Sequence, residues 1–333
     1  MIVGVITTIY PDSPAIPIIG SKVDELILVA DRKTPVDSPQ PFKLMTLEEQ
    51  NARFPKLAPL LPYDHYVRKN LGYLHAITSG AGFIYDADDD NFPYDTWTIP
   101  RPDEIGIVSG GNFANAYRLF CSDKIWPRGL PLDSLAPAEH FSVTKAAAGT
   151  APVHVWQGLA NGAPDVDAVW RLVYNTDFYF PKTESSSQFF ALQSGTFCPF
   201  NSQNTLWVEP SSFIFTYLPC TVGFRFTDIL RSYVATFGIW ARSGAIGFTP
   251  PTVEQKRNPH SNLKDFNDET EMYAWGSRLF DLLASSRLRG ADEDLLAMYD
   301  RLAQAGVVKS AELAVVEQWL GYASPRSISL PTN

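Results

Sequence analysis

Several features that would define a class of protein are scarce or missing in this chain of 333 residues. Its three cysteines, Cys121, Cys198 and Cys220, lie far apart and form no CxxC pair, so we expect neither a disulfide framework nor a zinc site. No run of about 18 uncharged apolar residues occurs, so we expect no membrane span. The start of the chain also lacks the pattern of a secretory signal. These absences indicate a cytoplasmic protein, or one that has been trimmed.

An excess of positive charge is missing too. Lys and Arg total 27 against 36 Asp and Glu, which gives a net charge of -9, so we expect no nucleic-acid partner. The glycine motifs of dinucleotide-binding and P-loop proteins do not occur, which removes the main support for those folds. Any phosphate site must therefore be local. The content of hydrophobic residues, 45%, is enough for one large core or two fused ones.

What is present predicts an α/β fold. Apolar runs at residues 2–9, 25–30 and 82–85 are typical of buried parallel strands. Between the second and third runs, residues 63–79 carry apolar side chains at helical spacing. The order of strand, helix and strand indicates an open sheet flanked by helices.

Polar residues end each of these three strands. Thr7 and Thr8 end the first, Asp31 ends the second, and an acidic run at residues 86–91 ends the third. In open α/β sheets the ligand lies beyond the carboxyl ends of the strands, so these groups should lie close together. We expect Thr7 and Thr8 to hydrogen-bond a base or ribose, and Asp31 to accept from a base or a ribose hydroxyl.

The rest of the chain is harder to assign. Residues 92–150 are broken by prolines and indicate loops that could cover a site. Residues 151–159 and 211–218 resemble strands, and residues 226–240 have a helical pattern. Beyond them the sequence predicts a terminal helical region, with helices at residues 269–286, 292–305 and 311–322.

The most informative segment is IYDADDDN, in which three consecutive carboxylates follow a buried strand. Like charges placed so close repel one another unless something positive is bound. Mg²⁺ or Mn²⁺ binds oxygen ligands and often takes one or two carboxylates together with substrate phosphates. Asp88 and Asp90 have the D-x-D spacing that suits such a cation. The alternative is an ordinary acidic surface turn.

Basic and amide side chains precede this acidic strand. Arg68 and Asn70 open the helix expected at residues 63–79, together with Lys69. From there they could reach a nucleotide or diphosphate that lies across the sheet edge. The alternative is a solvated basic face.

Several runs of the chain together resemble one family. In the first half these are ITTIYPD, VADRKTP, RKNLGYLHAI and IYDADDDN; in the second they are NGAPDVDAVWRL, PFNSQNTLW, LPCTVGFRFTDILRSYVA and FTPPTVEQKRNPHSNLKDF. They resemble the STELLO glycosyltransferases and, more distantly, the reversibly glycosylated polypeptides, which include UDP-arabinopyranose mutases. The resemblance covers about residues 4–278 and does not reach the helical tail.

The resemblance implies a GT-A fold, in which a Rossmann-like mixed sheet is flanked by helices. It implies a nucleotide-sugar donor, with uridine as the base, a divalent Mn²⁺ or Mg²⁺ at the acidic triplet, and a glycan or other hydroxyl acceptor. A catalytic domain would span residues 1–265, with a nucleotide-sugar half at 1–130 and an acceptor half at 131–265, and residues 266–333 would form the helical appendage. Plant members carry a membrane anchor, so the chain could also be a soluble fragment of a Golgi-lumenal enzyme.

The resemblance also suggests catalytic carboxylates. Asp228 falls at a shared acidic helix start and is the candidate general base, because such chemistry needs a carboxylate within reach of the acceptor hydroxyl. An N-capping role is the alternative. Asp165 and Asp167 fall on a shared loop, where they could bind acceptor hydroxyls, or one of them could cap a helix at residues 166–174.

Later residues complete the expected site. His260 is a candidate third ligand of the metal, and Lys264 a candidate partner of the diphosphate, although a loop histidine and a solvated lysine are the alternatives. Asn201 and Gln203 belong to an amide-rich run that suits sugar hydroxyls but also builds ordinary turns. Arg231 is assigned with them to acceptor binding.

The resulting hypothesis is a metal-dependent transferase that moves a sugar from a UDP-sugar to a hydroxyl acceptor, with inversion favoured over retention. Two alternatives stay open. One is a mutase that converts one ring form of a UDP-sugar into another without an acceptor. The other is a non-catalytic partner of a polysaccharide synthase that keeps the fold without turnover. The sequence does not indicate an oligomeric state.

Overall fold

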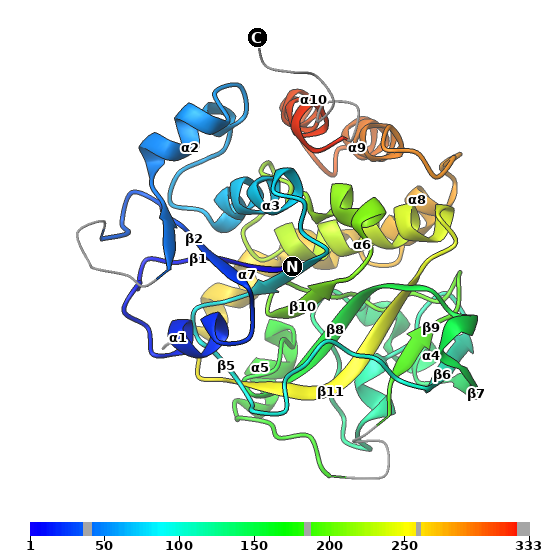
Figure 1. The fold of residues 1–333 in the computed structure, drawn as a ribbon. Helices are drawn as coiled ribbons and strands as arrows, with labels where there is room; N and C mark the ends of the chain where they lie inside the picture. The colour runs from blue at the N-terminus through cyan, green and yellow to red at the C-terminus, as the bar shows by residue number, and fades with distance from the viewer. Residues whose placement is uncertain (36–41, 183–187, 258–260, 325–333) are drawn as a thin grey trace.

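The computed structural model describes residues 1–35, 42–182, 188–257 and 261–324. Across these residues one mixed sheet forms the centre of the molecule, and its strands follow the order β3-β2-β1-β4-β10-β8-β11-β9-β6-β7, with β5 paired to β11 (Figure 1). The strands are β1 (Ile2–Thr7), β2 (Glu25–Val29), β3 (Lys43–Met45), β4 (Phe83–Ala87), β5 (Asn91–Pro93), β6 (Glu104–Gly110), β7 (Phe141–Ala147), β8 (Val153–Gly162), β9 (Phe190–Leu192), β10 (Asn204–Trp207) and β11 (Ala245–Gln255).

The first part of the sheet agrees with the sequence pattern. Strands β2, β1 and β4 are parallel neighbours, so Thr7 and Ala87 end at the same edge. Their side chains are buried on both faces, as near-continuous apolar runs predict. Gly72 of the following helix lies so close to β1 that an added Cβ would stand 2.4 Å from a methyl carbon of Val5. That close contact fixes the helix over the start of the site.

The second part of the sheet departs from several predictions. Strand β10 runs antiparallel between β4 and β8 and joins the two halves, although its polar start indicated a turn. Residues 211–218, expected to be a strand, lie mostly in the 3₁₀ helix η7, where Glu209 accepts a hydrogen bond from Ser211 and Pro210 occupies the first turn. The segment expected to be loops contributes β6 and β7 to the far edge of the sheet.

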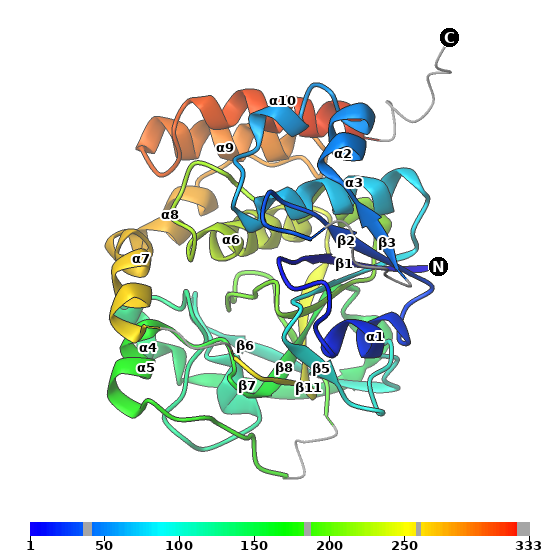
Figure 2. The same ribbon diagram turned by 90° about the vertical axis from the view of Figure 1, so that its left-hand side faces the viewer.

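Helices cover the sheet in layers. Helices α3 and α6 pack on one face, and α9 and α10 form a further layer outside them (Figure 2). Helix α1 packs near β2 and β5 on the opposite face, while α5 and α7 pack together. The α-helices are α1 (Ala15–Gly20), α2 (Leu47–Arg53), α3 (Lys69–Thr78), α4 (Leu135–Ala138), α5 (Ala168–Tyr174), α6 (Thr227–Ala241), α7 (Asn262–Trp275), α8 (Arg278–Ala284), α9 (Asp294–Ala305) and α10 (Ala311–Ala323).

Short 3₁₀ helices connect these elements: η1 (Ala58–Leu60), η2 (Tyr66–Arg68), η3 (Ala116–Leu119), η4 (Leu132–Ser134), η5 (Ala148–Thr150) and η7 (Pro210–Thr216). The helix expected at residues 269–286 is two helices, because Gly276 adopts a positive φ of 48° between α7 and α8. The domain boundary expected after residue 265 falls inside α7, and that division stays a prediction.

The mixed α/β sheet flanked by helices and the helical C-terminal region are thus confirmed. The larger core cluster lies on the side of α3 and α6 and continues into the outer helices. Among the described residues, no helix is long and apolar enough to cross a membrane.

Candidate functional site

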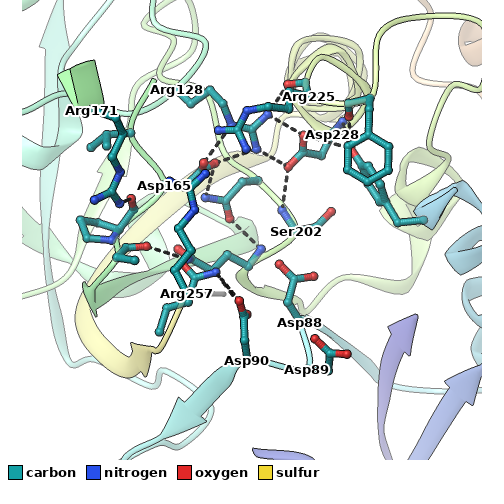
Figure 3. A pocket seen from close by; sticks show the side chains of 18 of the residues that line it. Asp88, Asp89, Asp90, Arg128, Asp165, Arg171, Ser202, Arg225, Asp228 and Arg257 are labelled. Atoms are coloured by element: carbon teal, nitrogen blue, oxygen red, sulfur yellow. Dashed lines mark hydrogen bonds and ion pairs between the residues drawn. The ribbon is translucent and has the colours of Figure 1, made fainter. Parts of the chain in front are cut away.

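A cavity of about 320 Å³ lies at the carboxyl ends of β1 and β4 (Figure 3). Carboxylates from three separate segments face it, together with arginines and amides that come from loops and helix starts. The residues that line it are Thr7, Tyr66, Asp88, Asp89, Asp90, Arg128, Ala163, Pro164, Asp165, Val166, Arg171, Asn201, Ser202, Gln203, Phe224, Arg225, Asp228, Gln255 and Arg257.

The acidic triplet forms one wall of this cavity, directly after β4. Asp88 accepts a hydrogen bond from Lys69 Nζ at 3.2 Å, and 43% of its side chain is accessible. Asp89 accepts from the hydroxyl of Thr8. Both carboxylate oxygens of Asp90 lie 3.1 Å from Nε2 of Gln255. The three side chains thus have different partners, and Asp88 and Asp90 point into the cavity in Figure 3.

A buried charge network lies behind the triplet. Asp86 is fully buried and accepts from Lys69 Nζ at 2.8 Å and from Arg231 Nη1 at 2.7 Å. Arg231 also donates to the main-chain oxygen of Asn201 at 2.6 Å. This network ties β4, α3 and α6 together under the floor of the cavity.

The surroundings of the triplet favour its protonated form when no cation is present. Burial raises the pKa of Asp88 to about 7. The neighbouring Asp90 also raises this pKa, whereas Lys69 lowers it. Burial likewise raises the pKa of Asp90 to about 6, although the hydrogen bond from Gln255 lowers it. The pKa of Asp89 is also raised by burial. These carboxylates therefore lack sufficient positive charge nearby.

The donor set suits a hard divalent cation only in part. Within residues 1–35, 42–182, 188–257 and 261–324, no group of three or more His, Cys, Asp or Glu side chains is arranged to hold a metal ion. Asp88 and Asp90 nevertheless supply two carboxylates to one cavity, which is the number that Mg²⁺ commonly takes when phosphates and waters complete its shell. His260, the expected third ligand, lies outside the described residues.

A second group of carboxylates on the same cavity is held by one arginine. Arg128 donates through Nε and Nη2 to the two oxygens of Asp165, at 2.8 and 2.9 Å. Through Nη1 and Nη2 it also reaches both oxygens of Asp228, at 3.0 and 2.8 Å. Such paired contacts are the strongest form of charged hydrogen bond in proteins. We call this arrangement the arginine clamp.

The clamp changes the chemistry expected of Asp228. This residue lies in the first turn of α6, but its side chain accepts from the main-chain N–H of Ser202 at 3.3 Å and from Tyr66 Oη at 3.3 Å. Burial alone would raise the pKa of Asp228, but the charge and hydrogen bonds of Arg128 outweigh it and lower that pKa. Asp228 is therefore ionised and weakly basic in this state.

Asp165 and Asp167, the two carboxylates expected on one loop, lie in different surroundings. Asp165 lines the cavity as part of the arginine clamp. Asp167 is fully buried away from it, where its side chain caps α5 by accepting from the main-chain N–H of Trp170 at 2.9 Å and also accepts from the indole of Trp126. Asp167 is therefore the helix cap that the sequence offered as an alternative, and it does not face the cavity.

The amide run lies where a ligand could contact it. Asn201 donates to Asp165 at 2.9 Å, and Gln203 donates to Gln255 and to the main-chain oxygen of Ala163. Between them, the hydroxyl of Ser202 is buried and has no hydrogen-bond partner among the described residues. A buried hydroxyl without a partner is costly, so this one is suited to a ligand.

A smaller cavity of about 270 Å³ adjoins the first and shares Thr7, Tyr66, Asp89 and Phe224 with it. Its further lining residues are Thr8, Ile9, Tyr10, Asp31, Lys33, Asp64 and His65. The expected positions of Thr7, Thr8 and Asp31 at one edge therefore agree with the structure. Asp31 accepts from the main-chain N–H of His65 at 3.1 Å, which fixes its carboxylate at the wall.

Aromatic rings form one side of this smaller cavity. The rings of His65 and Tyr66 stack with centroids 5.2 Å apart, and Phe224 lies 4.8 Å from His65. Burial lowers the pKa of His65 to about 4, so the imidazole is neutral near pH 7. The cavity thus combines flat neutral rings with the carboxylate of Asp31.

Two of the expected donor residues do not reach either cavity. Arg68 is fully buried, and its guanidinium donates to Gln50 Oε1 at 2.8 Å and to main-chain oxygens of the preceding loop. Asn70 is also fully buried and exchanges two hydrogen bonds of 2.8 Å with the main chain of Leu218. Both predictions are corrected: these side chains hold the loops around α3.

Two further predicted site residues, Lys264 and Arg231, lie on helices and do not reach the cavity. The Lys264 side chain is 76% exposed on α7 and pairs with Asp268 at 3.1 Å, so it does not face the cavity. Arg231, expected to bind the acceptor, is fully buried beneath the floor with Asp86 and is separated from the cavity by the Asn201 loop.

Several polar residues that line the cavity were not predicted from the sequence. Arg128 follows a proline in a segment interpreted as loops, Arg171 lies in the last turn of α5, and Gln255 ends β11, which the sequence did not predict. Arg257 also lines the cavity and has no sequence motif that would place it there. An arginine at the end of an amphipathic helix ordinarily indicates a solvated residue, so pattern alone could not assign Arg171 to the site.

No protein-family model matches the chain. It is 28% identical over 350 residues to the probable glycosyltransferase STELLO1 of Arabidopsis thaliana, which covers 97% of this chain and 45% of that protein. It is 31% identical over 295 residues to the probable glycosyltransferase STELLO2 of the same plant, which covers 81% of this chain and 38% of that protein. Over the matched region the chain is similar to the STELLO-type glycosyltransferases. It spans less than half the length of these two relatives.

A solved structure with a similar arrangement is glucosyl-3-phosphoglycerate synthase from Mycobacterium tuberculosis, in complex with Mn²⁺ and uridine-diphosphate-glucose. It shares 11% sequence identity with the present chain, with a TM-score of 0.39 over 83% of this chain and 78% of that one. A likeness this low does not establish a common function, so the site must be interpreted from its own residues.

Proposed function

We propose that this chain is the catalytic region of a GT-A-type glycosyltransferase that moves a sugar from a uridine nucleotide sugar to a hydroxyl acceptor. The observation that carries the proposal is the acidic wall of the cavity. Asp88 and Asp90 face one hollow at the end of a parallel strand, and burial keeps their pKa values raised to about 7 and about 6. Carboxylates that are short of positive charge at this edge are suited to Mn²⁺ or Mg²⁺ with a diphosphate.

The donor would occupy both cavities. The smaller one is lined by Asp31 and the rings of His65 and Phe224, so it can stack a flat base and accept from a ribose hydroxyl. The diphosphate would cross the shared wall at Thr7 and Asp89 to reach Asp88 and Asp90. A divalent cation bound there would neutralise charge on the departing diphosphate.

Arg257 takes the place of the two basic residues that lie elsewhere. It lines the larger cavity, and its charge lowers the pKa of Asp90. A guanidinium held near the diphosphate stabilises charge that develops there during transfer. Arg68 and Lys264 are not needed for this step.

The acceptor would enter beside the arginine clamp. Asp228 and Asp165 present oxygens there, and the free hydroxyl of Ser202 and the amide of Asn201 can bind sugar hydroxyls. We assign Asp228 as the carboxylate that receives the acceptor proton, with transfer by inversion. Because Arg128 lowers the pKa of Asp228, this step requires the acceptor to displace part of the clamp.

Titration calorimetry with UDP tests the proposal directly. We expect UDP to bind in the presence of Mn²⁺ and to bind at least about tenfold more weakly with EDTA or with Asp88→Asn plus Asp90→Asn, because the bridging charge is lost. Asp281→Asn is the matched control, since Asp281 is an exposed carboxylate on α8. Failure of the wild-type protein to bind UDP with Mn²⁺ would reject the donor site and favour a non-catalytic partner.

Incubation with single UDP-sugars separates transfer from isomerisation. A transferase releases UDP, slowly with water and faster with an acceptor, whereas a mutase yields an isomeric UDP-sugar and no free UDP. Chromatography of the nucleotide products distinguishes the two. We expect free UDP from at least one UDP-sugar.

A further inference from the structure

Arg171 differs from the other arginines of the larger cavity. It lies in the last turn of α5 and is 6% exposed, on the side of the cavity away from Asp228 in Figure 3. Its guanidinium donates from Nη2 to the main-chain oxygen of Pro164 at 2.8 Å and from Nη1 to that of Thr176 at 3.1 Å. Among the described residues, no carboxylate lies within ion-pair distance of it.

The other three arginines of the cavity each have a carboxylate partner. Arg128 binds the two carboxylates of the clamp, Arg225 pairs with Glu269 at 2.6 Å, and Arg257 pairs with Asp265 at 2.5 Å. Arg171 is therefore the cavity arginine whose charge has no close opposite charge in the described part of the chain. Burying such a charge is costly unless an anion joins it.

The electrostatics of the cavity agree with this geometry. Burial and, after it, repulsion from Arg257 lower the pKa of Arg171 to about 10, against the weaker attraction of Asp165 and Asp177. Arg257 is paired with Asp265, so Arg171 is the arginine that brings an unpaired positive charge to this cavity among the described residues. The acidic triplet brings negative charge to the cavity from a different segment of the chain.

The two carbonyl contacts hold the guanidinium in place without neutralising it. A guanidinium carries about five N–H donors in a rigid fork, so two main-chain contacts leave an edge that can bind an oxyanion in a bidentate manner. This edge is fixed before a ligand arrives, which reduces the entropy lost on binding. A purely structural role for Arg171 would not require the charge, because a neutral amide can donate to the same carbonyl oxygens.

The diphosphate of the proposed nucleotide-sugar donor would not pair with the positive charge of Arg171. A nucleotide diphosphate that binds at the acidic wall meets the cation there and Arg257, and Arg171 lies beyond them. We propose that Arg171 recognises an anionic group of the acceptor, so that the acceptor is a sugar or other hydroxyl compound that carries a phosphate or carboxylate. This inference rests on the proposed transferase function and names the class of its acceptor.

Binding of inorganic sulfate tests the inference without knowledge of the acceptor. Sulfate has the tetrahedral oxyanion of a phosphoester and does not precipitate Mn²⁺. In protein saturated with UDP and Mn²⁺, we expect calorimetry to show sulfate binding that Arg171→Gln weakens about tenfold or more, since one charged hydrogen-bonding pair is lost. Arg171→Lys should restore part of it, and Arg287→Gln, a change at an exposed arginine outside the cavity, should leave it unchanged.

Two results would overturn the inference. One is sulfate binding that is absent, or is equal in wild type and Arg171→Gln. The other is a loss of UDP affinity in Arg171→Gln that matches the loss of sulfate affinity, which would place Arg171 in the donor site. If UDP does not bind at all, the proposed function fails, while the sulfate titration of the UDP-free proteins still decides whether Arg171 holds an anion.

Matched sugars then identify the anion. Glucose, glucuronate and glucose 6-phosphate differ in the group at one carbon and are titrated against the UDP complex. We expect the wild type to bind one of the two charged sugars about tenfold more tightly than glucose, and Arg171→Gln to lose that preference while it unfolds at a similar temperature. Equal binding of all three sugars to the wild type would contradict an anionic acceptor.

Discussion

The acidic triplet and the arginine clamp line one cavity, yet the pKa values of Asp88 and Asp228 are shifted in opposite directions. Burial raises the pKa of Asp88 and Asp90 to about 7 and about 6, and the nearby cations offset this only in part. Asp228 is more deeply buried, but its pKa is lowered because Arg128 binds both of its oxygens. In the first group only Asp88 has an ion pair among the described residues, with Lys69, whereas both carboxylates of the second are paired with Arg128.

This difference indicates that the two groups have different roles, one in binding a ligand and the other in holding the fold of the site. A carboxylate without a partner can take a metal ion that arrives with the substrate, while a carboxylate paired with arginine fixes the geometry of the loops that carry it. The clamp joins three segments that are distant in the sequence, at Arg128, Asp165 and Asp228. The two carboxylate groups should therefore respond differently to mutation, ions and pH.

The largest effect is expected from breaking the clamp. Arg128→Met leaves two buried carboxylates without their cation and should lower the free energy of unfolding by about 3–5 kcal/mol, measured by urea denaturation at pH 7.5. The folded-state pKa of Asp228 is lowered in the wild type, so its stabilising contribution is present above the ordinary pKa of Asp and is lost as pH falls. The deficit of the variant should therefore shrink in acid.

Surface and compensating variants control for this result. Arg118→Met removes the partially exposed pair with Glu139 and should cost less than about 1 kcal/mol. Adding Asp228→Asn to Arg128→Met should recover part of the loss. Equal stability of Arg128→Met and wild type would show that the clamp does not hold the fold.

A somewhat smaller effect is expected in the acidic triplet, and there it concerns activity. Asp90→Ala should reduce the rate of UDP release from a UDP-sugar by an amount on the order of 3 kcal/mol in transition-state stabilisation, with little change in folding. The comparison at fixed Mn²⁺ uses Asp281→Ala as a surface control. Activity that survives within about tenfold would reject the metal assignment.

The response to metal should distinguish the two groups further. Mn²⁺ at about 100 times its Kd should add roughly 2.7 kcal/mol of stability, seen as a rise in Tm. Because the folded-state pKa values of Asp88 and Asp90 are raised, their contribution to metal-free stability is present in acid and is lost as pH rises towards 7. Protons compete with the ion below that range, so the rise in Tm should be larger at pH 8 than at pH 5.5. The double variant Asp88→Asn plus Asp90→Asn is the control, and its Tm should not rise when Mn²⁺ is added.

The smallest effect is expected at Asp167, which lies close to the clamp in sequence but caps a helix. Asp167→Ala should cost about 1 kcal/mol of stability, while Asp167→Asn keeps a capping oxygen and should cost less. UDP release should stay within twofold of wild type in Asp167→Asn, at a temperature where the variant is folded. A large loss of activity in that variant would show that Asp167 contributes to the reaction and is more than a helix cap.

The sequence predicted the strands that carry the donor end of the site. Strands β1, β2 and β4 are apolar runs that end in polar residues, and this pattern identified Thr7, Asp31 and Asp88 at one edge. Local composition was sufficient there because parallel strands are buried on both faces and their carboxyl ends meet. The role of each of these side chains towards a ligand stays a prediction.

The part of the site near β10 and β11 could not be predicted in the same way. Strand β11 contains Pro250 and Pro251 at an irregularity between Thr249 and Val253, so its sequence resembles a turn. Strand β10, which pairs with β4 and β8, has four residues and begins with Asn204. Both strands form because neighbouring strands supply hydrogen-bond partners on each side, which is a tertiary effect that no local pattern contains.

The same reason explains the basic residues that were assigned to the wrong place. The direction of a long side chain depends on what packs around it: Arg68 turns inward to Gln50, whereas Arg128 reaches carboxylates from two distant segments. The charges of these arginines are visible in the sequence, but their partners are not.

The buried network beneath the cavity floor has a consequence for how tightly a cation can be held. Lys69 and Arg231 place two positive charges against the single carboxylate of Asp86, and Lys69 also reaches Asp88. Lys69 thus offsets part of the charge of Asp88 and weakens the attraction of the acidic wall for a free ion. A diphosphate supplies the missing negative charge, so metal and nucleotide should enter and leave as one complex, and release of product should discharge the ion with it.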